Sequence, residues 1–287
     1  MCVPNHDKLR KRMSHILLVQ RAKRFSPNSE ERDRAIITAV MERLREKGHD
    51  IVMTDETMVS TMEADLKQTL EECDIVLSMA RDTVTLEWLA RMEEKGKKVI
   101  NSARALLRMN RRTILETAQR EGVATPPHAI GPLEHCPLPY PVWWKRDDRT
   151  SQEIGDVVFV RNDVEWQEVR ERDVQVQEYV VEQHLEGDLV KFYSVEGTPF
   201  FHWNYSEFSK FGNERQNTAT RGFRFDYNGL KWQADRLAKA MGLSIYGGDA
   251  IVTENGTPHL IDLNDWPSFS SCREEGAEAI ASLADNV

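Results

Sequence analysis

The 287-residue sequence has few of the residues from which cysteine- and histidine-based metal sites are built. Its four cysteines include no Cys-x-x-Cys pair, and its eight histidines include no His-x-His or His-x-x-x-His pair. These spacings exclude the usual zinc motifs. A chain of this length can bury a sizeable core without disulfides, so we expect the thiols to be reduced.

Long apolar runs are also lacking. No stretch approaches the ~20 residues that a membrane-spanning helix needs. The run Ile16–Val19 is too short for the apolar segment of a signal peptide. The formal net charge of −9 argues against nucleic acid as a partner. We therefore expect a soluble, cytoplasmic protein with no membrane and no nucleic-acid partner.

Basic residues are concentrated near the start of the chain. From Lys8 to Arg24 there are seven lysines and arginines and no acidic residue. Two interpretations are open: a solvated arm beside the first strand, or a rim that attracts an anionic ligand. We assign residues 1–13 to a basic N-terminal arm.

The first hundred residues alternate between strand and helix patterns. Short apolar runs predict strands at 15–20, 50–53, 74–78 and 98–101, and helical spacing predicts helices that begin at Ser29 and near residues 62 and 83. This rhythm predicts a parallel sheet covered by helices. No Gly-x-Gly-x-x-Gly follows the first strand, so residues 14–101 form a Rossmann-like domain without the dinucleotide signature.

The remaining sequence predicts an α+β arrangement. One helix is expected from Ala103 to Gly122, followed by strands at 141–146, 156–160, 177–182, 188–195, 199–205, 247–252 and 259–263 and by helices at 163–172 and 230–241. Within strand 141–146, alternation should place one of Trp143 and Trp144 in the core and the other on a pocket wall.

Three oxygen-bearing side chains are predicted to meet at one edge of a hairpin. Asp249 lies in the first strand of the hairpin, and Asp262 and Asn264 stand two residues apart in the second, so their side chains share one face. Two carboxylates and an amide suit Mg²⁺, which binds oxygen ligands together with substrate phosphates. The other interpretation is a strand edge that carries solvated acids.

Several segments resemble the ATP-grasp superfamily. The segment 262–268, DLNDWPS, resembles the Asp/Glu-x-Asn-x-x-Pro-Gly signature that ends this fold, and 242–249 looks like the strand before it. Segment 180–191, VVEQHLEGDLVK, is similar to the family's adenine-binding hinge, and 110–113, NRRT, to a phosphate-contacting helix start. The resemblance implies a two-lobed ATP-grasp fold behind the Rossmann-like domain, with a small lobe at 102–182 and a C-terminal lobe with the metal site at 183–287.

The same resemblance implies a nucleotide site. It assigns ATP as cofactor together with Mg²⁺, or Mn²⁺ in its place, with Asp249, Asp262 and Asn264 as metal ligands. The residues it assigns to ATP are Arg111, Lys145, Glu182, Gln183, Leu185, Asp188 and Lys191.

Reaction type and acceptor stay open at this point. The resemblance to glutathione synthetases and ribosomal-protein glutamate ligases implies a carboxylate–amine ligase that works through an acylphosphate. A weaker one to inositol tris- and tetrakisphosphate kinases implies transfer to a hydroxyl, and a non-catalytic nucleotide-binding module is a third reading. The expected partners are a small anionic molecule, either a carboxylate or a phosphorylated polyol, and a second copy of the chain in a homodimer. The candidate catalytic residues are Arg221, Arg224 and Lys210, with Arg215 and Arg273 as further arginines in the last lobe.

Overall fold

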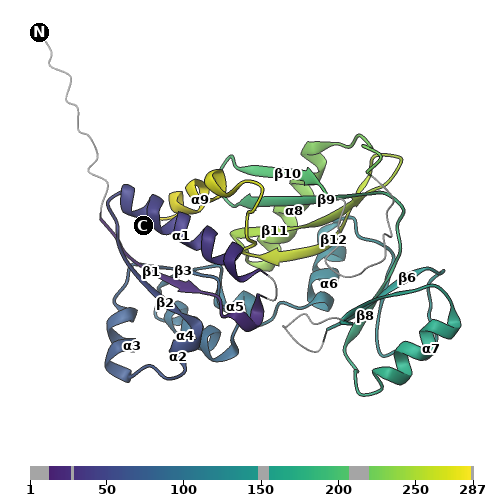
Figure 1. Cartoon of the computed structure of the whole chain (residues 1–287), viewed down its shortest axis with the longest axis horizontal. Coiled ribbons are helices and arrows are strands. Elements are labelled where there is room, and N and C mark those ends of the chain that lie inside the picture. Colours follow the sequence, from purple (N-terminus) through teal and green to yellow (C-terminus); the bar gives the residue numbers. More distant parts are fainter. Residues whose placement is uncertain (1–12, 27–28, 148–154, 207–219, 286–287) are drawn as a thin grey trace, which may run out of the picture.

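The computed structural model describes residues 13–26, 29–147, 155–206 and 220–285 (Figure 1). These residues form three four-stranded sheets, one parallel and two antiparallel, with helices packed against them. The mixture of α/β and α+β layers confirms the predicted fold class. Among the described helices, none is long and apolar enough to cross a membrane.

The first sheet is parallel, with strand order β2-β1-β3-β4. Its elements are β1 (His15–Gln20), η1 (Lys23–Phe25), α1 (Glu30–Glu46), β2 (Asp50–Asp55), α2 (Glu56–Val59), α3 (Ala64–Glu71), β3 (Ile75–Ser78), α4 (Thr83–Glu94) and β4 (Lys98–Ile100). Four consecutive residues of β1 and all four of β3 are buried, as expected for strands that are covered on both faces.

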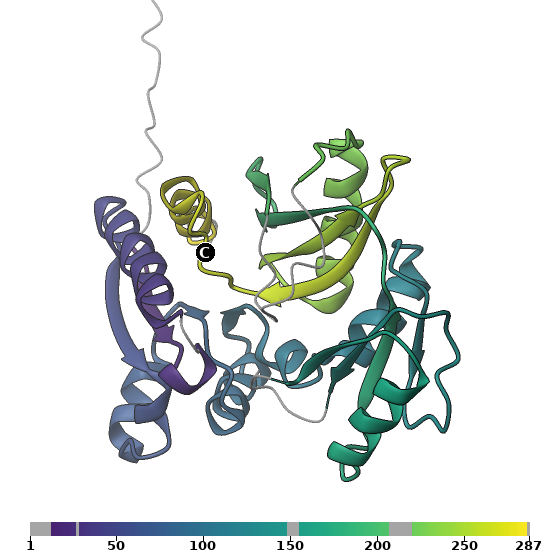
Figure 2. The ribbon, with the colours of Figure 1, turned by 45° about the vertical axis from the view of Figure 1, so that its right-hand side comes forward.

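The C-terminal helix α9 (Arg273–Ser282) returns to this first layer. The sequence pattern assigns these residues to the C-terminal lobe and predicts no helix there. It packs beside α1, and the apolar faces of the two helices share one cluster with Trp266 and Phe269 (Figures 1 and 2). The chain therefore closes on its own N-terminal layer.

The helical pattern predicted from Ala103 to Gly122 is confirmed, but as two helices, and the helix start that the resemblance places at 110–113 is present. The structure has two helices, α5 (Ala103–Leu106) and α6 (Arg111–Glu121), because Asn110 starts a new helix. The Asn110 side chain accepts from the Thr113 amide, and the Thr113 hydroxyl accepts from the Asn110 amide. Such a reciprocal cap satisfies donors that a continuous helix would bond internally.

The second sheet has strand order β5-β8-β6-β7. It consists of β5 (His128–Ile130), β6 (Val142–Arg146), β7 (Val157–Val160) and β8 (Tyr179–Gln183), with α7 (Asp163–Arg172) on one face. Strand β5 was expected to be an extended link. Trp144 is buried with α7 residues and Trp143 lies on the opposite face, so the predicted core position of one tryptophan is confirmed, and the pocket wall stays a prediction.

The third sheet has strand order β10-β9-β11-β12. Its strands are β9 (Asp188–Val195), β10 (Phe201–Tyr205), β11 (Ile245–Val252) and β12 (Pro258–Asp265), and α8 (Tyr227–Met241) covers one face. Gly187 joins the second sheet to the third. A Cβ there would lie 2.3 Å from the Val252 carbonyl oxygen, so only glycine fits this crossing.

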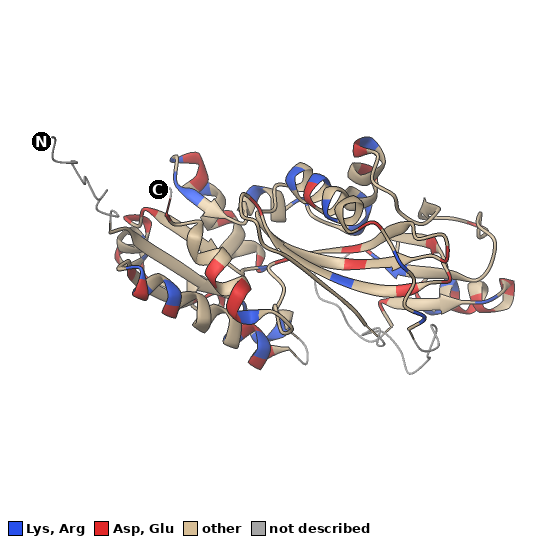
Figure 3. Ribbon diagram, turned by 90° about the horizontal axis from the view of Figure 1, so that it is seen from above, with Lys and Arg blue, Asp and Glu red and all other residues tan. Residues whose placement is uncertain are grey.

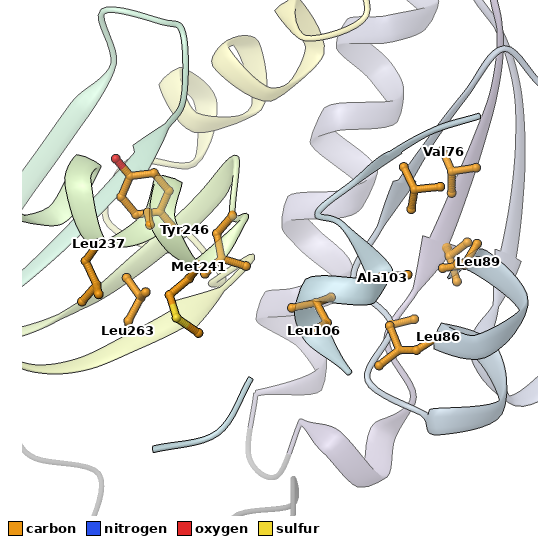
Figure 4. Packing of buried hydrophobic residues seen from close by; sticks show 14 of the residues in the cluster. Val76, Leu86, Leu89, Ala103, Leu106, Leu237, Met241, Tyr246 and Leu263 are labelled. Atoms are coloured by element: carbon orange, nitrogen blue, oxygen red, sulfur yellow. The ribbon is translucent and has the colours of Figure 1, made fainter. Parts of the chain in front are cut away.

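One apolar cluster connects the first layer to the third sheet. Figure 4 shows Val76, Leu86 and Leu89 on one side of it and Leu237, Met241, Tyr246 and Leu263 on the other, with Ala103 and Leu106 of α5 between them. Burial of this shared surface stabilises the relative placement of the two layers. The carboxyl ends of β1 and β3 are thereby held beside the end of β12.

Candidate active site

The predicted metal ligands lie together on one face of the third sheet. Asp249 is the register partner of both Lys191 on β9 and Asp262 on β12. Cross-strand partners project from the same face, so these side chains form one row, which Asn204 of β10 extends as the partner of Lys191. Figure 3 shows acidic and basic residues interspersed on the strands of this region.

Short contacts within the row define its chemistry. The Lys191 Nζ lies 2.8 Å from the Asp249 Oδ1, and the Asn264 amide nitrogen donates to Asp262 Oδ2 at 3.1 Å. Burial alone would lower the pKa of Lys191, but the Asp249 carboxylate and, less strongly, Asp262 raise it above its ordinary value. Lys191 therefore carries its charge at neutral pH.

The oxygen atoms of these side chains are suitable ligands for a hard divalent cation. Asp249 and Asp262 offer carboxylate oxygens, and the Asn264 nitrogen faces Asp262, so the amide oxygen remains as a ligand. In the described ranges, no three His, Cys, Asp or Glu side chains gather around one point. The candidate site has two carboxylates and one amide, a number that leaves coordination positions for phosphate and water.

Lys145 of the second sheet reaches this site. Its Nζ lies 2.6 Å from Glu182 Oε2 and donates to the Ile261 carbonyl oxygen at 3.1 Å. Ile261 directly precedes Asp262 in β12. Both side chains of the ion pair are less than a tenth exposed. A buried cation of one lobe therefore meets the acidic strand of the other.

A pocket lies where these elements meet. It is bounded by α6, α8, β8 and β12, and its lining residues are Arg111, Ile114, Leu115, Thr125, Glu182, Leu237, Leu260, Ile261 and Asp262. Three residues predicted for ATP or metal binding are thus brought to one cavity. The Arg111 side chain is held at the pocket by a hydrogen bond from its Nε to the Arg146 carbonyl oxygen, at 3.1 Å.

An aromatic cluster lies on the β6 face that carries Lys145, where Trp143 is the register partner of the pocket residue Glu182. Trp143 Nε1 donates to His184 Nδ1 at 3.2 Å, and the Trp143 and Phe159 ring centroids are 4.9 Å apart. Burial lowers the pKa of His184, so this ring is neutral at pH 7 and accepts from the indole. A neutral, largely apolar cluster of this kind suits a planar heterocycle.

The hinge between the sheets has contacts of its own. The backbone amide of Gln183 donates to the Pro127 carbonyl oxygen at 2.8 Å, and the nearby Leu185 is half-buried. Asp188 is buried, and its two carboxylate oxygens accept from the Arg221 and Phe223 amides, both at 2.7 Å. Asp188 therefore fixes the segment that enters α8.

The two predicted catalytic arginines that the structure describes do not lie at the predicted metal ligands. Arg221 is exposed and lies over the Phe223 ring, and Arg224 packs against the turn at Gly256. Among the described residues, no contact joins either arginine to Asp249. Lys210 and Arg215 lie outside the described residues. The catalytic assignments of these residues stay predictions.

Sequence reasoning missed two groups of polar residues. Tyr193 and His202 are register partners next to the Lys191–Asn204 pair, and strand alternation from Lys191 would have found Tyr193. Arg21 and Arg81 enter from the first layer and both bind the buried Asp265. Arg21 belongs to the basic stretch, but it is buried rather than part of a solvated arm or rim.

The structure resembles solved structures of known proteins, although its sequence does not match known families. No protein-family model and no curated protein sequence matches the chain. The N5-carboxyaminoimidazole synthetase structure from Staphylococcus aureus aligns with a TM-score of 0.68 at 14% identity, over 96% of this chain and 78% of that chain. The RimK domain ATP-grasp protein from Sphaerobacter thermophilus aligns with a TM-score of 0.63 at 17% identity, over 94% and 99%.

A third structure, D-alanine–D-alanine ligase from Bacillus anthracis complexed with ATP, aligns with a TM-score of 0.62 at 12% identity, over 94% of this chain and 97% of that one. At these identities the likeness concerns the fold. It agrees with the motifs at 110–113, 180–191 and 262–268 and with the three-sheet architecture. The chain has the fold of the ATP-grasp superfamily.

Proposed function

We propose that this protein is a Mg-ATP-dependent ligase that joins a small carboxylate to an amine. The observation that carries the proposal is the contact of Lys145 with Ile261, which brings a buried cation to the strand that holds Asp262 and Asn264. Proteins of similar fold are named as a synthetase and as ligases, one of them complexed with ATP, and this favours ligation over the alternatives.

The residues have separable roles in this proposal. Lys145, Lys191 and Arg111 neutralise the triphosphate, and the aromatic cluster at Trp143 with the hinge at 183–187 accommodates the base. Asp249, Asp262 and Asn264 hold Mg²⁺, which offsets charge on the transferring phosphoryl group. Because Lys191 is bonded to Asp249, its ammonium must exchange partners when metal and phosphate bind.

The proposed reaction has two balanced steps. A carboxylate oxygen of the substrate attacks the γ-phosphorus and ADP leaves, which gives an acylphosphate. The amine nitrogen then attacks the acyl carbon, inorganic phosphate leaves, and the nitrogen loses a proton. The protein holds the reactants in place and excludes water from the acylphosphate.

The test is ATP turnover with pools of amino acids, small carboxylates, amines and inositol phosphates. We expect phosphate release that needs both a carboxylate and an amine. It should fall at least about 10²-fold in Asp262→Asn, whereas Glu254→Gln, an exposed acid in the turn of the same hairpin, should keep it. Label retained on a polyol without free phosphate would instead indicate a kinase. ATP binding without turnover in any pool would contradict the ligase assignment.

A further inference from the structure

The carboxyl ends of three parallel strands are tied together by one acidic side chain. Glu56, which follows β2, is buried, and its carboxylate accepts from the backbone amides of Ala22, Arg81 and Asp82. Ala22 follows β1, and Arg81 and Asp82 follow β3. In open parallel sheets, ligands bind beyond this end of the strands.

A second acidic side chain connects this end of the first sheet to the third sheet. Arg21 donates to Asp265 Oδ2 at 3.2 Å and to Asp33 Oδ2 at 3.2 Å. Arg81 donates to the other oxygen, Asp265 Oδ1. Asp265 directly follows Asn264, so the Arg81 guanidinium is held next to the end of the metal-binding strand. Burial acts to lower the pKa of Arg81, but the Asp265 carboxylate and, less strongly, Asp262 raise it above its ordinary value.

Arg81 differs from the other cations described at this junction in having a buried donor without an acceptor. Arg21 has its donors on two carboxylates and on the carbonyl oxygens of Met79 and Trp266. The Nζ atoms of Lys145 and Lys191 lie on Glu182 and Asp249. The Arg81 Nε is buried and has no hydrogen-bond partner among the described groups.

A carboxylate is the anion that this arrangement fits. A guanidinium presents its donors in a planar fork, and a carboxylate can bind two of them in parallel. Asp265 occupies one terminal nitrogen of Arg81 and fixes the plane, while the Nε side stays without an acceptor. The Arg21–Asp265 pair behind it keeps the guanidinium from turning away.

We propose that Arg81 binds a carboxylate of the acceptor substrate at the junction of the first and third sheets, with Arg21 and Asp265 as positioning residues. That the bound carboxylate belongs to the acceptor substrate rests on the proposed ligase function. Carboxylate binding at Arg81 does not depend on it. The site selects for an anionic substrate that reaches from the metal-bearing strand to the end of β3.

The direct test follows the ¹⁵Nε–H resonances of the arginine side chains during titration with acetate, succinate and L-glutamate. Arg81→Lys assigns the Arg81 signal by its loss. We expect that signal to shift saturably with at least one carboxylate and to be unmoved by acetamide. The exposed Arg24, paired with Asp82, serves as the control and should show no saturable shift. If no carboxylate shifts Arg81 saturably, the proposal is wrong.

A second measurement separates this proposal from the ligase assignment. With a turnover-supporting carboxylate in hand, Arg81→Lys should raise KM for that carboxylate about tenfold or more and change kcat by less than about threefold. An unchanged KM would overturn the role of Arg81 and leave the ligase function standing. Saturable acetate binding in a protein that turns over no ATP would support the carboxylate site and contradict the ligase.

Discussion

The Lys145 ammonium and the Glu182 carboxylate form a buried ion pair, with Nζ 2.6 Å from Oε2. The pair lies at the interface between the two antiparallel sheets. The pair lies beside the pocket bounded by Asp262, and Lys145 also binds the carbonyl oxygen next to that residue. In the proposed function, this one side chain therefore serves both phosphate binding and the contact between the lobes.

Variants of Lys145 should distinguish its effect on stability from its effect on turnover. Lys145→Met leaves Glu182 buried without its cation and should lower the free energy of unfolding by about 3–5 kcal/mol. The double variant Lys145→Met/Glu182→Gln should recover most of that loss, because no unpaired charge remains. Turnover should stay abolished in both variants. Urea unfolding and the turnover assay measure the two effects, and recovered turnover in the double variant would contradict the phosphate role.

Lys191 should compete with metal for Asp249. Its raised pKa keeps the ammonium charged, so in the absence of nucleotide it must be displaced before Asp249 can coordinate a cation. Lys191→Met should therefore raise the Mn²⁺ affinity of the nucleotide-free protein several-fold, measured by electron paramagnetic resonance. Lys95→Met, which removes an exposed lysine from the pair with Glu71, is the control. Weaker Mn²⁺ binding in Lys191→Met would exclude this competition.

Asp265 should make stability depend on pH in the acid range. Burial alone would raise its pKa, but Arg81 and Arg21 overcome this and lower the pKa below its usual value. Its contribution is therefore present above the unfolded-state pKa of about 3.9 and is lost as pH falls through the lower folded-state pKa.

The matching experiment compares wild type with Asp265→Asn. The variant should be about 3–5 kcal/mol less stable at pH 7, because the buried Arg21 and the partly buried Arg81 lose the negative charge that they share. The difference should shrink as pH falls below about 4. A difference that stays constant down to pH 2 would contradict the electrostatic role.

Two of the thiols should be almost inert. Burial raises the pKa of both Cys73 and Cys272 to about 11, and both are free in the structure. Alkylation by iodoacetamide at pH 8 should be about 10²-fold slower at these sites in the native protein than in urea, since little thiolate is present. Peptide mass mapping reads each site separately, and equal rates in the two states would contradict the buried environment.

The sequence predicted the metal-ligand row because strand geometry is local. The period of two residues places Asp262 and Asn264 on one face, and the short hairpin turn brings Asp249 opposite Asp262. The same periodicity divided Trp143 from Trp144. It could not place Arg81 or Arg21, since their bonds to Asp265 span 184 and 244 residues of sequence and depend on packing between layers.

Other errors have equally specific causes. The apolar pattern continues through 103–122 and did not by itself show the cap at Asn110 that divides the segment, whereas the motif at 110–113 indicated it. The basic stretch suggested a solvated arm or an anion-attracting rim. Arg21, which belongs to this stretch, instead forms buried ion pairs with Asp33 and Asp265. No local sequence pattern predicts that these residues are its partners.

We propose that the second and third sheets together form one Mg-ATP site. Calorimetric titration with a non-hydrolysable ATP analogue and Mg²⁺ tests it most directly, on wild type, Lys145→Met, Asp262→Asn and the control Glu254→Gln. We expect saturable binding to wild type and Glu254→Gln, and binding at least about tenfold weaker when a residue of either sheet is changed. Absence of binding to wild type, or equal affinity in all four proteins, would contradict it.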